Sequence, residues 1–590
     1  MRVIAAISLV APFAAALSAQ RPSPTLDTVV IVGSRAGTGV RSSGSVGVIT
    51  RADIAASPAR TIADLLASSL GVDVYSRSAA QTDVSMRGST ADQVLLLVDG
   101  VRVSDVQSSH YATDLTVPLD AIERIEVLRG MASAVYGPGA VGGVINIVTR
   151  RGARAARATV RGGSFGSVGG DASGSLGGAL SAAANYDKSD GHRDGTDFRI
   201  AQGRVNYATP LAEGTLSTNA GLAVRDFGAA DFYAPYNSIE RTVSTTADVR
   251  WNRAVDVWAI DAVAGTRRHQ DHYVLVRGNP GLYENRHESW QSVGSLDVRR
   301  AFGDVTAAVG TELEHDQLSS FRLGGRREWR EGTFSELAGT SSALAWNAGA
   351  RADHSSAYGD FVSPAASAAF DVTTNVRVHA NGGAGFRAPT WTERYYVDPS
   401  NVGDANLRVE RFTTADAGVR WTTSHSSADV TTFQRHAHDL IDWVRPIGAT
   451  SPWHARNVGS ATFHGIEATV QGPEVAGVRA EVFGSGIEMS AAERDSVVGK
   501  YALRPVTRQI GARLMSDPAR ALSARVEILS ARRAAEQGYT TANIRVSWRE
   551  SSYRLTIDAL NLANAVWLDA SGRPAPSRSV FVGAAIPGRL

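Results

Sequence analysis

Apolar and polar residues alternate along most of this 590-residue chain, and this alternation limits most strongly what the chain can fold into. In the segment "NIRVSW", Ile544, Val546 and Trp548 would share one face of a strand, with Arg545 and Ser547 on the other. The segments "RLTIDA" and "VRVHAN" repeat the pattern. From about residue 153 to its end, the chain therefore predicts β-strands with one apolar face and one polar face.

A soluble β-sandwich and a membrane β-barrel share this alternation, and the length of the alternating region distinguishes them. A sandwich of roughly 440 residues is rare as a single unit. A barrel strand of about 10 residues and its connection use about 20 residues, so this region has room for on the order of 22 strands. A barrel of that size has a lumen wide enough to need a plug. We therefore expect an all-β membrane barrel of about 22 antiparallel strands.

The chain begins with what we interpret as a secretory signal peptide, residues 1–19. One Arg precedes an apolar stretch from Val3 to Leu17, and small residues suited to cleavage follow. A membrane-anchoring helix is the alternative, although Pro12 interrupts the stretch and no stop-transfer pattern follows it. Beyond this segment, no run of about 18 apolar residues predicts a membrane-spanning helix.

The composition excludes several kinds of function. The 60 Lys and Arg residues nearly balance the 58 Asp and Glu residues, which does not favour a nucleic-acid-binding protein. The chain has no Cys, so it has no disulfide framework, no thiolate metal site and no Cys nucleophile. Any binding must therefore come from local groups of side chains.

The distribution of apolar residues along the sequence changes near residues 150–154. Upstream, apolar residues come in compact blocks: Ile62, Leu65 and Leu66 have helical spacing, and "QVLLLVDGVRV" predicts a strand, an Asp-Gly turn and a second strand. These blocks predict a small α+β domain over residues 35–152, of a size suited to plug a barrel formed by residues 153–590.

Two long motifs carry a family resemblance. Residues 87–103, "RGSTADQVLLLVDGVRV", and residues 122–152, "IERIEVLRGMASAVYGPGAVGGVINIVTRRG", resemble the plug domain of TonB-dependent outer-membrane receptors. Barrel segments such as "GFRAPTWTERYY" and "NVGSATFHGIEATV" are similar to the cobalamin-receptor-like branch of that family. The resemblance covers essentially the whole mature chain.

A short strand-forming segment follows the signal peptide within residues 20–34, and it resembles the TonB box. An isolated strand suits capture by β-augmentation, in which the periplasmic protein TonB adds the peptide to its own sheet. The alternative is that this segment is simply the first strand of the plug, and the sequence does not exclude it. The expected TonB-binding residues are Asp27, Thr28, Val29, Val30 and Ile31.

The resemblance implies a transporter in the outer membrane of a Gram-negative-type cell and not an enzyme. The expected partners are TonB, outer-membrane lipid and a large ligand, with no nucleic acid, for a protein that acts as a monomer and requires no cofactor. Cobalamin or a related corrinoid is the favoured ligand, and a ferric siderophore is the main alternative. Haem is third, because the stretch after "FRAP" contains no His. From a different class, an adhesin or structural barrel remains the competing interpretation, although it would need neither a TonB box nor a plug.

The resemblance also implies a latch between plug and barrel. In the family, plug arginines pair with carboxylates on the inner barrel wall. Arg87 and Arg129 match the plug side, and Glu467 matches one carboxylate. Asp416 falls where relatives commonly carry Glu, so its shorter side chain makes that contact less certain.

Two plug loops are predicted to face the ligand, because binding residues concentrate on loops held by a rigid scaffold. They comprise residues 75–83 and 104–114. Aromatic residues of two barrel loops are further candidates, although aromatics of such barrels most often form the interfacial girdle. The candidate ligand contacts are Arg77, Gln81, Gln107, Ser108, His110, Tyr111, Tyr233, Tyr236, Trp391 and Tyr395.

Four carboxylates in "YDKSDGHRDGTD" offer oxygen ligands to Ca²⁺, which orders the outer loops of some cobalamin receptors. The spacing is not that of an EF-hand loop, and a hydrated hairpin tip is the alternative. The four residues are Asp187, Asp190, Asp194 and Asp197. At the other end of the chain, the last strand is expected to stop near Ile586, or insertion uses a variant signal, because the C-terminus lacks the usual aromatic residue.

Overall fold

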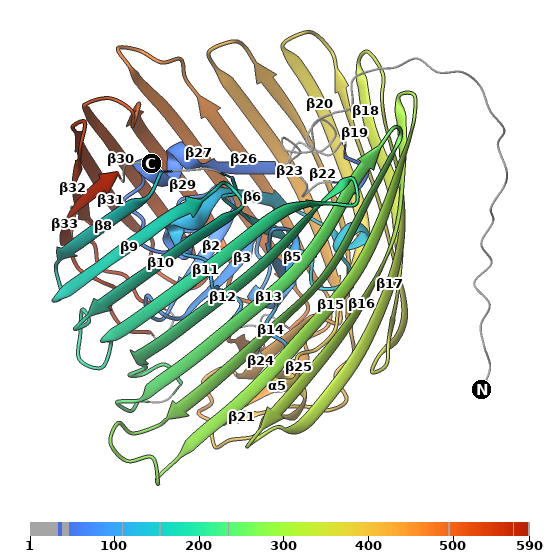
Figure 1. Cartoon of the computed structure of the whole chain (residues 1–590). Coiled ribbons are helices and arrows are strands. Elements are labelled where there is room, and N and C mark those ends of the chain that lie inside the picture. Colours follow the sequence, from blue (N-terminus) through green and yellow to red (C-terminus); the bar gives the residue numbers. More distant parts are fainter. Residues whose placement is uncertain are drawn as a thin grey trace.

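A computed structural model describes residues 34–37, 46–108, 110–152, 155–233, 235–493, 496–569 and 572–587. Their strands form a closed antiparallel barrel of 22 strands around an N-terminal domain (Figure 1). The last strand pairs with the first barrel strand, Phe581 opposite Gly163, and this pairing removes every free sheet edge from the wall. The predicted fold class is thus confirmed.

The barrel strands follow one another around the wall in chain order. They are β8 (Arg157–Gly163), β9 (Ser167–Leu176), β10 (Leu180–Ser189), β11 (Phe198–Leu211), β12 (Gly214–Gly228), β13 (Ile239–Val255), β14 (Trp258–Val274), β15 (Glu284–Phe302), β16 (Val305–Ser320), β17 (Gly324–Thr340), β18 (Leu344–Ser355), β19 (Gly359–Asp371), β20 (Val376–Arg387), β22 (Glu410–Thr422), β23 (Ser427–His438), β26 (Ala461–Gln471), β27 (Val478–Ala491), β29 (Val506–Ser516), β30 (Leu522–Arg533), β31 (Tyr539–Arg549), β32 (Arg554–Leu560) and β33 (Ser579–Pro587).

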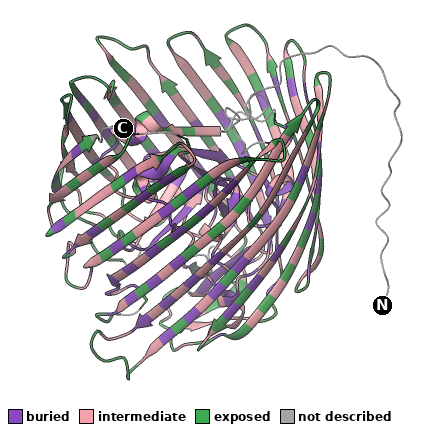
Figure 2. Cartoon of the chain, in the orientation of Figure 1, coloured by how far each residue is buried: buried purple, intermediate pink, exposed green. Residues whose placement is uncertain are grey.

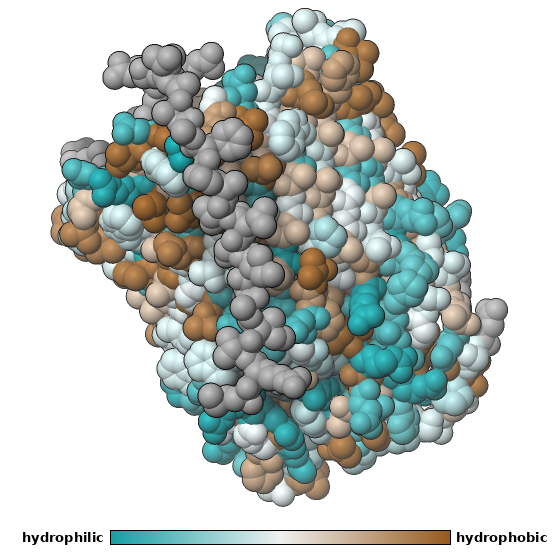
Figure 3. Space-filling view, turned by 90° about the vertical axis from the view of Figure 1, so that its right-hand side faces the viewer, coloured by the Kyte–Doolittle hydropathy of each residue, from teal (hydrophilic) through white to brown (hydrophobic). Residues whose placement is uncertain are grey.

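The wall has the polarity expected of a membrane barrel. Trp548 is exposed on the outside while its neighbour Ser547 is buried on the lumen side, as the alternation predicts. Figure 2 shows buried and exposed residues alternating along the strands. In Figure 3, hydrophobic residues are spread over one outer face and hydrophilic residues form a broad patch in its lower half. The apolar outer positions suit contact with lipid.

The plug fills the lumen with a mixed five-stranded sheet, a hairpin and short helices. The sheet order is β1-β6-β7-β4-β5, and β2 pairs with β3. Thr50 and Thr61 start the first two helices with capping boxes, which satisfy free backbone N–H groups. The elements are β1 (Val46–Thr50), α2 (Arg51–Ala56), α3 (Ile62–Ala67), β2 (Val72–Ser76), β3 (Thr82–Met86), η2 (Ala91–Gln93), β4 (Val94–Val98), β5 (Val101–Arg102), η3 (Leu119–Ala121), β6 (Ile122–Arg129), α4 (Ser133–Tyr136) and β7 (Gly143–Thr149).

The predicted Asp-Gly turn lies between β4 and β5. Asp99 and Gly100 both have positive φ, 52° and 80°, as a two-residue hairpin turn of this kind requires. The Asp99 carboxylate accepts hydrogen bonds from the backbone and hydroxyl of Thr149 at the end of β7. The turn between β4 and β5 is therefore also bonded to the end of the neighbouring strand β7.

The two ends of the barrel differ. Short turns join strands at one end, and longer connections join them at the other, which is the extracellular end in barrels of this type. At this loop end, three connections form a small sheet of order β21-β25-β24-β28, shown toward the bottom of Figure 1. We call this sheet and helix α5 the lid. Its elements are α5 (Trp391–Tyr395), β21 (Asn401–Val402), β24 (Ile441–Pro446), β25 (Trp453–Asn457) and β28 (Val497–Gly499).

Plug elements run from Val46 to Thr149, and barrel strands begin at Arg157. The last strand ends at Pro587, close to the expected stop. No helix among the described residues is long and apolar enough to span a membrane. The predicted signal peptide, residues 1–19, and the predicted TonB-binding residues 27–31 lie outside the described part of the chain.

Candidate functional site

The first plug loop joins β2 to β3 and is tied to neighbouring loops by polar contacts. Arg77 pairs with Asp83 at 3.1 Å, and the Nδ1 atom of His110 lies 3.0 Å from the same carboxylate. Burial alone would raise the pKa of Asp83, but His110 and Arg77 outweigh it and hold that pKa below its usual value. Gln81 Nε2 donates to Tyr233 Oη at 2.7 Å. The fold thus brings four predicted contact residues, Arg77, Gln81, His110 and Tyr233, into one cluster.

The second plug loop is anchored to the barrel wall and the lid. Tyr111 is buried and donates its hydroxyl to Glu240, while its ring packs against His269 at 4.7 Å. Burial raises the pKa of Tyr111 far above 10, so its hydroxyl stays protonated. The backbone carbonyl of Gln107 accepts from Thr392 of the lid, and the Ser108 hydroxyl donates to Asp105. These contacts hold the second plug loop against the barrel wall and the lid.

The predicted barrel aromatics lie in different surroundings. Tyr236 is exposed at the loop end. Trp391, in helix α5 of the lid, is buried with Leu318 and Leu323. Tyr395 carries the Arg326 guanidinium over its ring at 3.9 Å. Contact of any of them with a ligand stays a prediction.

A large hollow lies between the plug and the wall formed by β9–β11 and β29–β33, and we call it the lateral cavity. Its volume is about 430 Å³, within the usual range for ligand sites. On the plug side it runs from α3 along β2 to the first loop. On the barrel side Tyr539 stacks on Trp567 with ring centroids 4.8 Å apart. Most of its lining is apolar.

A smaller hollow of about 80 Å³ lies between the plug loops and the lid, and we call it the apical cavity. Its floor contains Ser108 and His110, and its roof contains Asp442, Lys500 and Tyr501. The Tyr501 ring lies 5.5 Å from that of His110, centroid to centroid. The three roof residues were not predicted, because they lie in two separate loops whose approach depends on barrel closure.

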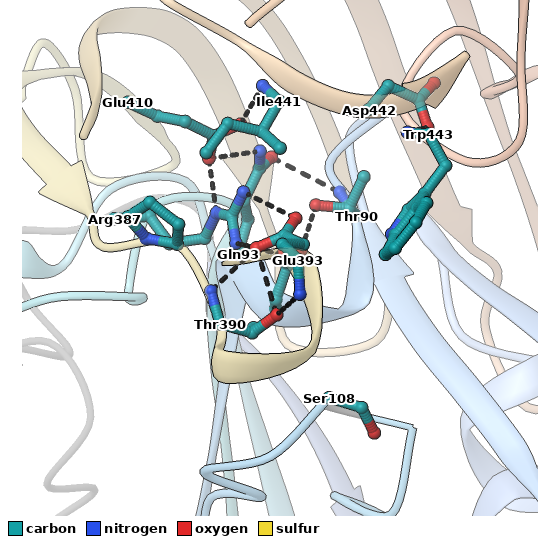
Figure 4. Close-up of polar contacts among 12 residues, drawn as sticks. Thr90, Gln93, Ser108, Arg387, Thr390, Glu393, Glu410, Ile441, Asp442 and Trp443 are labelled. Carbon is teal, nitrogen blue, oxygen red and sulfur yellow. Dashed lines mark hydrogen bonds and ion pairs between the residues drawn. The ribbon is translucent and has the colours of Figure 1, made fainter. Parts of the chain in front are cut away.

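A buried network ties the lid to the plug beside the apical cavity (Figure 4). Arg387, at the end of β20, pairs with Glu410 of β22, Glu393 of α5 and Asp92 of the plug. Glu410 also accepts from Gln93 Nε2 and from the backbone N–H of Ile441 in β24. Plug, wall and lid therefore share one set of hydrogen bonds.

The four predicted latch residues come together at one plug–barrel contact. Glu467 accepts from Arg87 Nη2 at 2.8 Å and from Arg129 Nε at 3.2 Å. Asp416 lies farther from Arg87, 3.5 Å from its Nη1 atom. The longer distance fits the shorter Asp side chain that the sequence places there.

A second anchor, which sequence reasoning missed, lies just after the predicted TonB box. Arg35 pairs with Asp297 of the wall, and its guanidinium lies 4.9 Å from the centre of the Tyr136 ring of the plug. The backbone N–H groups of Arg35 and Ala36 donate to Glu336 at 2.8 Å and 3.1 Å. An Arg beside the predicted box was visible in the sequence, but its partners are 262 and 301 residues away.

The expected calcium cluster is not formed. Among the described residues, no group of three or more His, Asp or Glu side chains could hold a metal ion. Asp187 is buried against Arg161 and Asp197 pairs with Arg277, while Asp190 points to solvent and Asp194 is exposed. Arginines thus pair with two of the four carboxylates, and the residue spacing alone did not reveal these pairs.

A wide antiparallel barrel whose lumen is filled by an N-terminal plug defines an outer-membrane transporter or receptor. The TonB-dependent receptor plug domain matches residues 39–144, and the TonB-dependent receptor-like β-barrel matches residues 149–564. The second match alone covers more than half of the chain, which therefore belongs to the TonB-dependent receptor family. It is an outer-membrane, TonB-dependent transporter, and its family consists of transporters and receptors, which are not enzymes.

Relatives with different named ligands resemble this chain. The vitamin B12 transporter BtuB of Photobacterium profundum is 27% identical over 468 residues, 72% of each chain. An iron-regulated outer membrane virulence protein of Vibrio cholerae is 26% identical over 566 residues, 84% of this chain and 82% of that protein. The siderophore receptor PirA of Pseudomonas aeruginosa superposes with a TM-score of 0.74 at 19% identity, covering 92% of this chain and 99% of its own. At that identity the structural likeness shows the fold alone.

Proposed function

We propose that this protein transports cobalamin or a related corrinoid across the outer membrane, with energy supplied through TonB. Relatives named as vitamin B12 transporters support the ligand class. The observation that carries the proposal is the charge balance of the lateral cavity. Three arginines line it, and each lies near a carboxylate: Arg60 near Asp187, Arg77 near Asp83 and Arg533 near Asp73.

This balance favours a ligand without a large net charge. The lining contains six carboxylates beside the three arginines, so the cavity offers no cationic excess to a polyanionic iron chelate. Corrinoids present an apolar ring system edged with amide side chains. Such a ligand suits an apolar cavity with hydroxyl and amide groups such as Thr541, Asn543 and Gln509.

A ferric siderophore receptor is the second candidate, supported by the solved structures named for siderophores, PirA among them. A catecholate chelate would need free cationic side chains at the lateral cavity, and the three arginines there are already paired. Haem stays a third candidate. An adhesin is less well supported, because a filled lumen and a plug serve no purpose in adhesion.

The TonB contact is proposed for residues 27–31. Arg35 holds the chain at the turn end of the barrel only four residues after this segment, on the periplasmic side. A periplasmic partner that binds by adding a strand to its sheet acts from that side. Transport in this proposal needs no bound cofactor, and the expected calcium site has no part in it.

Equilibrium binding to the purified, detergent-solubilised protein tests the ligand. Cyanocobalamin, ferric enterobactin and hemin are titrated in parallel. We expect cyanocobalamin to bind most tightly, and Trp567→Ala to weaken it roughly two- to tenfold, because one aromatic contact contributes about 0.5–1.5 kcal/mol. Trp548→Ala, which changes a lipid-facing Trp, is the matched control. Tight binding of ferric enterobactin without cyanocobalamin would instead make the protein a siderophore receptor.

A further inference from the structure

The lateral and apical cavities are neighbours that share one wall. Asp73, Tyr75 and Arg533 line both. Arg533 donates to both carboxylate oxygens of Asp73 at 2.8 Å and lies 4.1 Å from the centre of the Tyr75 ring. This ion pair and this ring therefore lie between a hollow of about 430 Å³ and one of about 80 Å³.

The two hollows differ in size and in the residues that line them. The lateral cavity presents aromatic and aliphatic side chains such as Tyr539, Trp567 and Leu529. The apical cavity is lined by the plug loops and the lid and contains five carboxylates, four of which pair with Arg side chains while the fifth, Asp442, accepts backbone hydrogen bonds. Two neighbouring hollows of such unequal size suit a ligand with a large body and a small arm.

The apical cavity contains donors that the protein itself does not fully use. Lys500 Nζ donates to Asn401 at 2.7 Å, and within the described part of the chain it has no carboxylate within 4 Å. The other cations of this cavity do: Arg504 pairs with Glu536, and Arg533 with Asp73. The hydroxyl of Thr392 is buried and has no hydrogen-bond partner among the described residues. An unmet buried donor is costly, so these groups favour an incoming oxygen ligand.

We propose that the protein holds its ligand in two parts, with the body in the lateral cavity and an arm carrying an anionic oxygen group, such as a phosphodiester, in the apical cavity against Lys500 and Thr392. This inference rests on the proposed corrinoid function. For a corrinoid, the arm is the nucleotide side chain with its phosphodiester. The protein then discriminates between a complete cobalamin and a cobinamide, which has the same ring but lacks that arm.

The test compares cyanocobalamin with dicyanocobinamide on the purified full-length protein. We expect wild type to bind cyanocobalamin about tenfold more tightly or better, since a hydrogen bond to a charged group contributes about 1.5–3 kcal/mol. Lys500→Gln and Thr392→Val should each lower the affinity for cyanocobalamin and leave the affinity for cobinamide within about twofold of wild type. Lys500→Arg should retain most of the wild-type affinity for cyanocobalamin. Lys188→Gln is the matched control, because Lys188 is the only other lysine of the chain and lines neither cavity.

The outcomes separate this inference from the function on which it rests. Equal binding of the two corrinoids, or an equal loss of both in Lys500→Gln, would overturn the arm contact while leaving corrinoid transport intact. Binding of neither corrinoid would overturn the proposed function and the inference with it. Loss of cyanocobalamin affinity alone in the Lys500 and Thr392 variants would establish the two-part site.

Discussion

Glu467 holds two arginines of the plug with one carboxylate, and all three side chains are largely removed from solvent. A buried ion pair of this kind adds little net stability, because desolvation offsets the Coulombic attraction. Removing one member is different, since it leaves a buried charge without its partner. At this position the uncompensated charges would be the guanidinium groups of Arg87 and Arg129.

We predict that Glu467→Gln lowers the free energy of opening the plug around Arg87 by about 3–5 kcal/mol, the cost of breaking a buried pair. The measurement is hydrogen exchange of plug amides around Arg87 in the detergent-solubilised protein, with thermal unfolding of the barrel followed alongside. Glu474→Gln, at an exposed turn, is the control and should change neither. Unchanged exchange near Arg87 would show that the contact is not a latch.

One buried carboxylate of the lid joins two of its connections by hydrogen bonds. Asp442 in β24 is buried and accepts backbone hydrogen bonds from Trp443, Tyr501 and Leu503 at 2.8–3.1 Å. Burial raises the pKa of Asp442 from 3.8 to about 7, although these three bonds oppose the rise. A raised pKa means that the folded lid binds the proton more tightly than the unfolded chain does. The contribution of Asp442 to the stability of the folded lid is therefore complete below about pH 4 and is lost as the pH rises through about 7.

We predict that the lid opens more readily at pH 8 than at pH 6. Hydrogen exchange of the backbone amides of β24 and β25 at the two pH values, corrected for intrinsic rates, measures this. Asp442→Asn should remove most of the difference, whereas Asp439→Asn in the same connection, whose carboxylate pairs with Arg408, should keep it. The same pH difference in both variants would assign the effect to other groups.

At the scale of the whole molecule, the proposed function places ligand binding and energy input at opposite ends of the barrel. The cavities lie toward the loop end, and Arg35 lies toward the turn end beside the predicted TonB box. The outer membrane has no ATP supply of its own, and in the proposed function energy arrives through the strand that TonB captures. Binding and uptake are therefore separable by mutation.

We predict that deleting residues 27–31 abolishes uptake of labelled cyanocobalamin by cells without another receptor. Equilibrium binding by the purified variant should stay within about twofold of wild type, because the deletion leaves both cavities unchanged. A matched deletion of residues 21–25 should preserve both activities. Continued uptake after loss of residues 27–31 would show that TonB does not act through this segment.

Local patterns in the sequence predicted the elements well. The helix containing Leu65 and Leu66 and the outward face of Trp548 follow from side-chain periods of 3.6 and 2, which the backbone sets within a few residues. The latch residues Arg87 and Glu467 were predicted only through resemblance, since 380 residues separate them. The network around Arg387 and the apical cavity around Lys500 were not predicted.

The sequence by itself therefore determined the architecture: alternation over a long region requires a large barrel, and the compact blocks before it require a separate domain. Only the tertiary structure decided which polar side chains meet inside. Strand register and barrel closure bring Thr392 and Lys500, from different loops, to one hollow above the plug. Such long-range contacts depend on the combined geometry of many strands. No local pattern in the chain encodes that geometry.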